Sequence, residues 1–263
     1  MIDTHCHLTF PQLAGDVEGA IARSVAAGVT SWITVGTDAR ENEKAVELAH
    51  RYENMYAAVG VHPHEAKDAT DESFSRMREL AKDGKVVAIG EAGLDFHYDL
   101  SPREIQKGVF IRQIEIAVQT GLPLVIHSRE ASDDTLEILE KYGGGLKKVV
   151  FHCFTGGVEQ AKILLEKGFY MSFTGAVTFK NAAAVRESAK VVGVDRMMLE
   201  TDSPYMSPEP VRKQKINEPA LMVHTARFIA QLKGMGFEQF AEAVTRTSVD
   251  FYGLQGAARG RRG

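Results

Sequence analysis

The chain has few of the residues that mark disulfide-rich or membrane proteins. It contains two cysteines, Cys6 and Cys153, among 263 residues. Two cysteines cannot form a disulfide framework, so a reducing, cytoplasmic compartment is the expected location. No apolar run reaches the roughly 18 residues of a transmembrane helix. The N-terminus also lacks the basic region and apolar run of a secretory signal, so association with a membrane is not expected.

The chain also lacks an excess of positive charge, with a formal net charge of −4. This balance argues against sequence-independent binding along a nucleic-acid backbone, which needs a basic face. It leaves a phosphate-containing substrate open, because bound metal ions supply positive charge locally. Residues 1–255 are predicted to form one domain, and the basic segment 256–263 a disordered tail. No obligatory protein partner is indicated, and a monomer is expected.

Short β-rich runs recur along the chain at the spacing of βα units. Each is mostly apolar without alternation, as expected for parallel strands covered on both faces. The eight runs are 1–7, 30–36, 56–62, 85–91, 122–128, 147–153, 168–174 and 195–201.

Amphipathic stretches separate these runs, for example 103–119, where Ser101 and Pro102 are predicted to be the cap and first helical residue. An extra helix is predicted over 238–252 and an irregular stretch over 203–218. The pattern predicts a single-domain α/β fold, a (β/α)8 TIM barrel with an extra C-terminal helix. The alternative, an open doubly wound sheet, lacks its glycine-rich phosphate fingerprint after the first strand.

The first run carries two histidines two residues apart, His5 and His7. Residues at this spacing on a strand point to the same face, whereas Cys6 between them points to the other. A pair of neutral imidazoles is a good beginning of a metal site. Taken alone, however, the pair is equally consistent with two hydrogen-bonded polar residues at a strand end.

The other predicted strands favour the metal site. Potential ligands also lie at the carboxyl ends of the fourth, fifth, sixth and eighth strands, the end of a barrel at which active sites are built. Buried carboxylates need paired charge, which cations provide. The predicted metal ligands are His5, His7, Glu91, His127, His152 and Asp202. This set exceeds what one tetrahedral ion needs, so two divalent ions bridged by Glu91 are predicted.

Further candidates lie beside these ligands. His64 and Arg129 are predicted to contact a substrate phosphate, although Arg129 is equally consistent with a structural salt bridge. His62 and Glu200 are predicted to support the ligands, Glu200 as the partner of a ligating histidine. Two aromatic residues are candidates either for stacking on a base or for packing: Phe154 and Tyr205.

Seven segments in order resemble one family. They are DTHCHL at 3–8, GVHPHEA at 60–66, IGEAGLDFHYD at 89–99, PLVIHSREA at 123–131, FHCFTGG at 151–157, LETDSPYMSP at 199–208 and NEPA at 217–220. Together they resemble the TatD family of metal-dependent deoxyribonucleases, within the amidohydrolase-like superfamily of barrel hydrolases. The resemblance covers nearly the whole chain.

The resemblance implies a (β/α)8 fold and a divalent-metal site. It implies that His5, His7 and Asp202 bind a first ion. It also implies that Glu91 bridges to a second ion held by His127 and His152. The implied activity is hydrolysis of phosphodiester bonds, chiefly 3′–5′ exonucleolytic on DNA, with magnesium, manganese or zinc.

The expected mechanism uses a water activated by two metal ions, with Asp202 as its base and Glu91 as the second catalytic residue. One alternative is an amidohydrolase, deacylase or lactonase acting on a carbonyl substrate. Many such barrels use a carboxylated lysine as the bridge, whereas the fourth run here ends in Glu91, which favours phosphodiesters. Another alternative is a metal-binding protein without catalysis, for which the ligand set is larger than a closed structural site requires.

Overall fold

The computed structural model describes residues 1–254, so the predicted tail at 256–263 lies outside the described residues. Eight parallel strands follow one another in the order of the chain, with helices between them. This succession confirms the predicted (β/α)8 fold class. Over the described range, no helix is long and apolar enough to cross a membrane.

The chain divides into two compact units. Among the described residues, the first comprises Met1–Thr34 and 153–254, and the second comprises Val35–His152. The strands of the first unit are β1 (Ile2–Cys6), β2 (Ser31–Val35, whose last residue belongs to the second unit), β7 (Tyr170–Phe173) and β8 (Met197–Leu199). Its helices are α1 (Pro11–Ala14), α2 (Val17–Ala26), α7 (Val158–Glu166), η2 (Gly175–Thr178), α8 (Ala183–Val191), η3 (Pro219–Leu221), α9 (Met222–Leu232) and α10 (Phe237–Tyr252).

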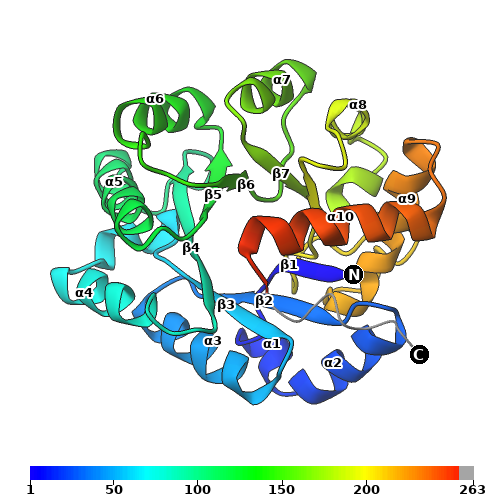
Figure 1. Ribbon diagram of the computed structural model, residues 1–263, viewed down its shortest axis with the longest axis horizontal. Helices are drawn as coiled ribbons and strands as arrows, with labels where there is room; N and C mark the ends of the chain where they lie inside the picture. The colour runs from blue at the N-terminus through cyan, green and yellow to red at the C-terminus, as the bar shows by residue number, and fades with distance from the viewer. Residues whose placement is uncertain (255–263) are drawn as a thin grey trace. The chain divides into compact units, whose positions relative to one another are not determined.

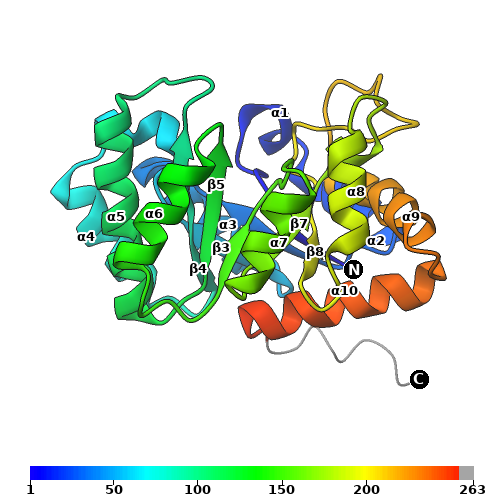
Figure 2. The ribbon, with the colours of Figure 1, turned by 90° about the horizontal axis from the view of Figure 1, so that it is seen from above.

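In the first unit, β1 pairs with β2 and β7 pairs with β8, all in parallel. The C-terminal helix α10 packs on β8 and β1, as Figures 1 and 2 show. Its buried residues Phe240, Val244 and Phe251 recur at helical spacing and form one apolar face. Gly253, with a left-handed φ of 67°, follows its last turn. The predicted extra terminal helix is therefore confirmed.

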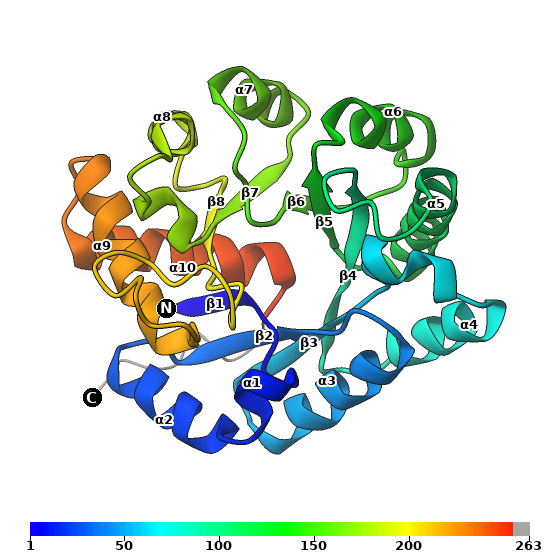
Figure 3. The same cartoon turned by 180° about the vertical axis from the view of Figure 1, so that it is seen from behind.

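The irregular stretch before η3 is tied to helix α2. No helix or strand lies between β8 and η3, as predicted for 203–218. In Figure 3, α2 and the segment around η3 lie side by side, and they are in contact. The Arg23 guanidinium donates to both carboxylate oxygens of Glu218, at 2.7–3.0 Å. This bidentate pair fixes the segment that follows the predicted ligand Asp202.

The second unit contains strands β3 (Met55–Val59), β4 (Val86–Asp95), β5 (Leu124–Arg129) and β6 (Val149–Phe151). They pair in parallel in that order. Its helices are α3 (Ala39–Arg51), η1 (Pro63–Asp68), α4 (Asp71–Leu80), α5 (Arg103–Thr120) and α6 (Ser132–Tyr142). Helices α5 and α6 run beside β4 and β5 (Figure 2).

Strand β4 is longer than the sequence indicated. The prediction that Glu91 closes this strand is wrong, because pairing with β5 continues through Gly93↔His127 to Asp95↔Arg129. Gly93 permits this close approach, since a Cβ at this position would collide with the carbonyl oxygen of His127. Its φ of +143° also favours glycine. The extension places Asp95 on the same face as Glu91, one strand repeat beyond Gly93.

The start of α5 also differs from the prediction. The helix begins at Arg103, with Pro102 at the N-cap position and no side-chain cap. The Ser101 hydroxyl instead donates to the carbonyl of His64 (2.7 Å) and accepts from the backbone N–H of Lys67 (3.1 Å). Ser101 is therefore used to fix the η1 segment rather than to cap α5.

Candidate metal centre

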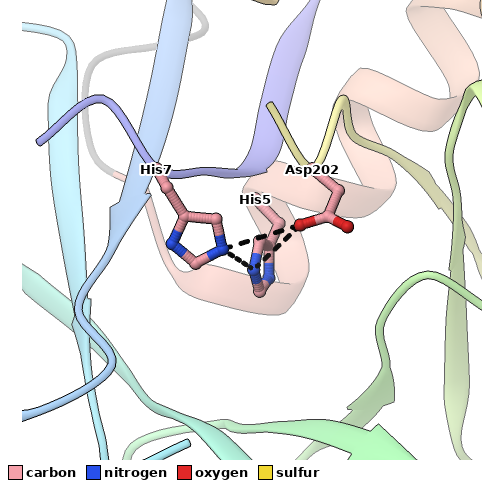
Figure 4. A group of neighbouring side chains, drawn as sticks. All are labelled: His5, His7 and Asp202. Carbon is pink, nitrogen blue, oxygen red and sulfur yellow. Dashed lines mark hydrogen bonds and ion pairs between the residues drawn. The ribbon is translucent and has the colours of Figure 1, made fainter. Parts of the chain in front are cut away.

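The first unit brings three predicted ligands together, His5, His7 and Asp202, here called the first cluster. Figure 4 shows the imidazole of His5 in β1, the imidazole of His7 just after it and the carboxylate that follows β8 turned toward one another. The two Nε2 atoms are 3.2 Å apart. Asp202 Oδ1 lies 3.6 Å from Nε2 of His7 and 3.9 Å from Nε2 of His5. Cys6, between the histidines, directs its thiol to the carbonyl of Ile33, away from the cluster.

These donor atoms fit a bound cation. Histidine and carboxylate ligands sit about 2.0–2.2 Å from a transition ion such as zinc, so neighbouring ligand atoms are separated by roughly 3–3.5 Å. The His5–His7 and His7–Asp202 distances in the first cluster are close to this value, and the His5–Asp202 distance of 3.9 Å is longer. Two nearly fully buried imidazoles with one carboxylate are also a common donor set for divalent ions.

Asp202 is positioned by backbone contacts with β1. Its N–H donates to the carbonyl of His5 (2.9 Å), and the N–H of His7 donates to the carbonyl of Ser203 (2.8 Å). Asp202 has a left-handed φ of 51°, a conformation that aspartate tolerates better than most residues. Two backbone hydrogen bonds thus join the segment of His5 and His7 to the segment of Asp202 and Ser203.

A second buried carboxylate, Asp3, strengthens this junction. It accepts from both the backbone N–H and the hydroxyl of Thr201, at 2.9 and 2.6 Å. Burial raises the pKa of Asp3 to about 7, although the hydrogen bonds from Thr201 act in the opposite direction. Asp3 is a residue of the DTHCHL segment to which the sequence analysis assigned no role.

Glu200 was predicted to support a ligating histidine. A Glu200 carboxylate oxygen lies within 4.8 Å of a ring nitrogen of His5. Its two oxygens accept from the Cys153 backbone N–H and from the Ser172 hydroxyl, each at 2.6 Å. Glu200 therefore lies beside the first cluster and is held there by β7 and by the residue after His152.

The second unit gathers the remaining predicted ligands, Glu91, His127 and His152, here called the second cluster. Glu91 Oε1 is 2.8 Å from Nδ1 of His127 and 2.6 Å from Nε2 of His152. The two imidazole nitrogens are 3.2 Å apart. Glu91 lies inside β4, whereas His127 and His152 lie near the carboxyl ends of the neighbouring strands β5 and β6. The three facing atoms are within hydrogen-bond distance of one another, and two imidazoles with a carboxylate are a donor set that suits a divalent ion.

His62 lies beside the second cluster but is oriented as a hydrogen-bond donor. Its Nδ1 accepts from the backbone N–H of His64 (3.1 Å), so in the neutral ring Nε2 carries the hydrogen. That nitrogen is 3.4 Å from Glu91 Oε1. Burial lowers the pKa of His62 to about 4, against the opposing effect of Glu91, and keeps the ring neutral. His62 is therefore placed to donate to the carboxylate of the second cluster.

Asp95 is a buried residue of this site that sequence reasoning missed. Its Oδ2 accepts from Nε2 of His127 (2.9 Å) and from Nε2 of His64 (3.0 Å). Burial opposes its ionisation, but hydrogen bonds from His127, the Tyr98 N–H and His64 hold its pKa well below the usual range. Burial also tends to lower the pKa of His127, but Asp95 and Glu91 raise it overall. Asp95 thus orients His127 so that Nδ1 faces Glu91.

Replacing Asp95 with asparagine is expected to weaken binding of divalent ions. The variant loses the charge that fixes the His127 ring and raises its basicity, and such changes typically cost roughly 10–100-fold in metal affinity. Competition between the protein and a coloured chelator measures this affinity. Asp99→Asn, which removes an exposed carboxylate paired with Arg103, is the matched control. Equal ion affinity in Asp95→Asn and in the wild type would show that Asp95 has no such role.

The predicted phosphate contacts lie next to the second cluster. His64 donates to the same Asp95 oxygen as the predicted ligand His127. The Arg129 guanidinium lies over the Tyr98 ring, 4.7 Å from its centre. Of the two aromatic candidates, Phe154 is buried and packs edge to face on Phe173. The interpretation of Phe154 as a packing residue is therefore confirmed. Tyr205 is about half exposed.

Comparison with known proteins places this geometry in a family. The model of TatD-related DNases matches residues 2–253. The chain belongs to the TatD-related DNase family. Its relatives include the uncharacterized metal-dependent hydrolase YabD of Bacillus subtilis, 42% identical over 94% of this chain and 97% of that protein. Another is the 3′-5′ ssDNA/RNA exonuclease TatD of Cronobacter sakazakii, 38% identical over 89% of this chain and 90% of that protein.

The fold agrees with this TatD assignment. The crystal structure of the TatD homologue YjjV from Escherichia coli matches with a TM-score of 0.91 and 29% identity, over 97% of this chain and 98% of that one. The predicted TatD resemblance and the predicted enzyme class, a metal-dependent hydrolase of the TatD type, are thereby confirmed.

Proposed function

We propose that this chain is a metal-dependent nuclease that removes nucleotides from the 3′ end of single-stranded DNA. The observation that carries the proposal is the spacing of the donor atoms. In each of the first and second clusters, two imidazole nitrogens and a carboxylate oxygen lie within 3.9 Å of one another, close enough to share one ion. Membership in the TatD-related DNase family supports a phosphodiester substrate over a carbonyl substrate.

The proposal assigns one divalent ion to each cluster, with magnesium, manganese and zinc as the candidates. His5, His7 and Asp202 would hold the first ion, and Glu91, His127 and His152 would hold the second. When bound, such ions lower the pKa of a bound water and neutralise charge on phosphate oxygens. The protein's contribution is to fix the rings. Asp95 binds Nε2 of His127, so Nδ1 of that ring faces Glu91. The backbone hydrogen bond from Asp202 to His5 holds Asp202 beside β1.

Asp202 is the proposed base. Its carboxylate is partly exposed, at 14%, whereas both imidazoles of its cluster are nearly fully buried. A carboxylate that water can reach, held by backbone hydrogen bonds, is suited to accept the proton of an attacking water. His64 and Arg129 are the proposed contacts of the substrate phosphate, since a guanidinium pairs with two phosphate oxygens at once.

The test is hydrolysis of a 5′-labelled single-stranded oligodeoxynucleotide by metal-stripped protein to which magnesium, manganese or zinc is returned. The proposal expects cleavage only with an added ion, and products that shorten stepwise from the 3′ end. Duplex DNA, RNA and a small aryl phosphodiester, assayed in parallel, define the substrate class. If the protein binds ions but hydrolyses none of these substrates, the nuclease proposal fails, and ester and amide substrates become the next assay.

A further inference from the structure

An exposed tyrosine follows strand β4, close to the second cluster. Tyr98 is 54% exposed, among the most exposed large hydrophobic side chains in the described part of the chain. Two imidazoles meet its ring edge to face: His97 with centres 4.8 Å apart, and His64 with centres 5.5 Å apart. The Arg129 guanidinium lies over the same ring, 4.7 Å from its centre. Tyr98 is therefore held in a defined orientation although more than half of it is exposed.

One carboxylate connects this tyrosine to the second cluster. The N–H of Tyr98 donates to Asp95 Oδ1 (2.9 Å), while Asp95 Oδ2 accepts from His127 and His64. The position of Tyr98 is therefore fixed relative to the ligand His127 by a continuous set of hydrogen bonds. Because the Arg129 guanidinium lies over one face of the ring, a group stacked on Tyr98 would lie on the opposite face.

The charges around Tyr98 suit an anionic ligand that carries a planar group. The neighbouring carboxylates already have partners: Glu130 is 2.7 Å from Nδ1 of His97, and Asp99 pairs with Arg103. Arg129 forms no ion pair in the described structure with either carboxylate. A cation over an aromatic ring is stabilised by the ring and keeps its donors available for phosphate.

We infer that Tyr98 and Arg129 form a nucleotide-binding platform, in which the Tyr98 ring stacks on the base of the 3′-terminal nucleotide and Arg129 contacts its phosphate. The inference rests on the proposed nuclease function and names the part of the substrate that this surface recognises. Stacking on an aromatic side chain accepts every base, because each has a flat π face. The platform therefore selects for an unpaired, unstacked end rather than for a sequence.

Binding of a single-stranded oligodeoxynucleotide, followed by fluorescence anisotropy, tests the platform. The probe carries a phosphorothioate at its last linkage to slow cleavage, and a second probe lacks the base of its 3′-terminal residue. Tyr98→Ala is expected to bind the complete probe roughly tenfold more weakly than the wild type, the usual effect of losing one stacked base. On the abasic probe the two proteins are expected to bind equally.

Two variants serve as controls. Tyr98→Phe keeps the ring and is expected to bind like the wild type, which separates stacking from loss of the hydroxyl. Tyr142→Ala removes another exposed tyrosine of the second unit, at the end of α6, and is expected to bind both probes like the wild type. Thermal melting of each variant checks that it is folded.

The outcomes separate the platform from the nuclease proposal. If the wild type cleaves DNA from the 3′ end while Tyr98→Ala binds both probes like the wild type, the platform is overturned and the nuclease stands. If Tyr98→Ala binds the complete probe and the abasic probe more weakly by the same factor, base stacking is likewise overturned. If the wild type neither binds nor cleaves any oligonucleotide, both proposals fail. Base-dependent binding without cleavage supports the platform and refutes the nuclease.

Discussion

Glu91→Gln is expected to lower the rate of hydrolysis at least about a thousandfold, because metal-ion catalysis contributes several kcal/mol and each 1.4 kcal/mol is a factor of ten. Glu91 is 3% exposed, and its Oε1 lies within 3.4 Å of three imidazole nitrogens. Glutamine keeps the size of the side chain but removes its negative charge. The ion predicted at the second cluster then loses an anionic ligand, and the buried histidines lose their shared partner.

Steady-state hydrolysis of single-stranded DNA, measured together with bound metal, tests the Glu91 prediction. The matched control is Glu72→Gln, which makes the same change at an exposed position of α4 and is expected to retain full activity. Loss of activity accompanied by loss of bound ion agrees with the proposed role. Activity within a factor of a few of the wild type in Glu91→Gln would show that Glu91 is not required for hydrolysis.

Asp202→Asn is expected to reduce the rate of the chemical step by about 10²–10⁴-fold, the usual contribution of a positioned general base. The backbone hydrogen bonds that join Asp202 to His5 and Ser203 to His7 do not involve the Asp202 side chain, so asparagine can occupy the same place. The amide can still contribute an oxygen ligand but cannot accept a proton. The expected result is therefore a slow enzyme that retains most of its bound metal.

Single-turnover kinetics at saturating ion concentration separates this effect on chemistry from weaker ion binding. Asp195→Asn, at an exposed position just before β8, is the control for an aspartate change in the same unit. If Asp202→Asn turns over at nearly the wild-type rate with its ions bound, Asp202 is not the base. If it is inactive only because no ion binds, the residue acts as a ligand alone.

The course of most strands was predictable from sequence, because parallel strands covered on both faces appear as short apolar runs. For strand β4 this pattern did not predict the correct end. Its second half contains Gly93, a residue depleted in strands, yet β4 continues to Asp95 because that glycine allows close approach to β5. The contact depends on a residue 34 positions away, and a local pattern cannot report it.

The candidate ligands could be predicted because each lies at or near the carboxyl end of a strand, where a barrel concentrates its chemistry. Asp95 was missed because the predicted strand ended before it, so its shared face with Glu91 was not apparent. Tyr98 lies in the turn after β4, where no periodic pattern distinguishes a residue with its backbone N–H bound to Asp95 and its ring under Arg129 from an ordinary surface aromatic. The hydrogen-bonding state of His62 depends on the backbone N–H of His64, which only coordinates reveal.

Anomalous X-ray scattering from crystals of the manganese- or zinc-loaded protein tests the central claim most directly, because it locates each ion independently of activity. We expect one anomalous-scattering peak among His5, His7 and Asp202 and another among Glu91, His127 and His152. Crystals of protein with demonstrated metal-dependent activity that show no ion at either cluster would contradict it.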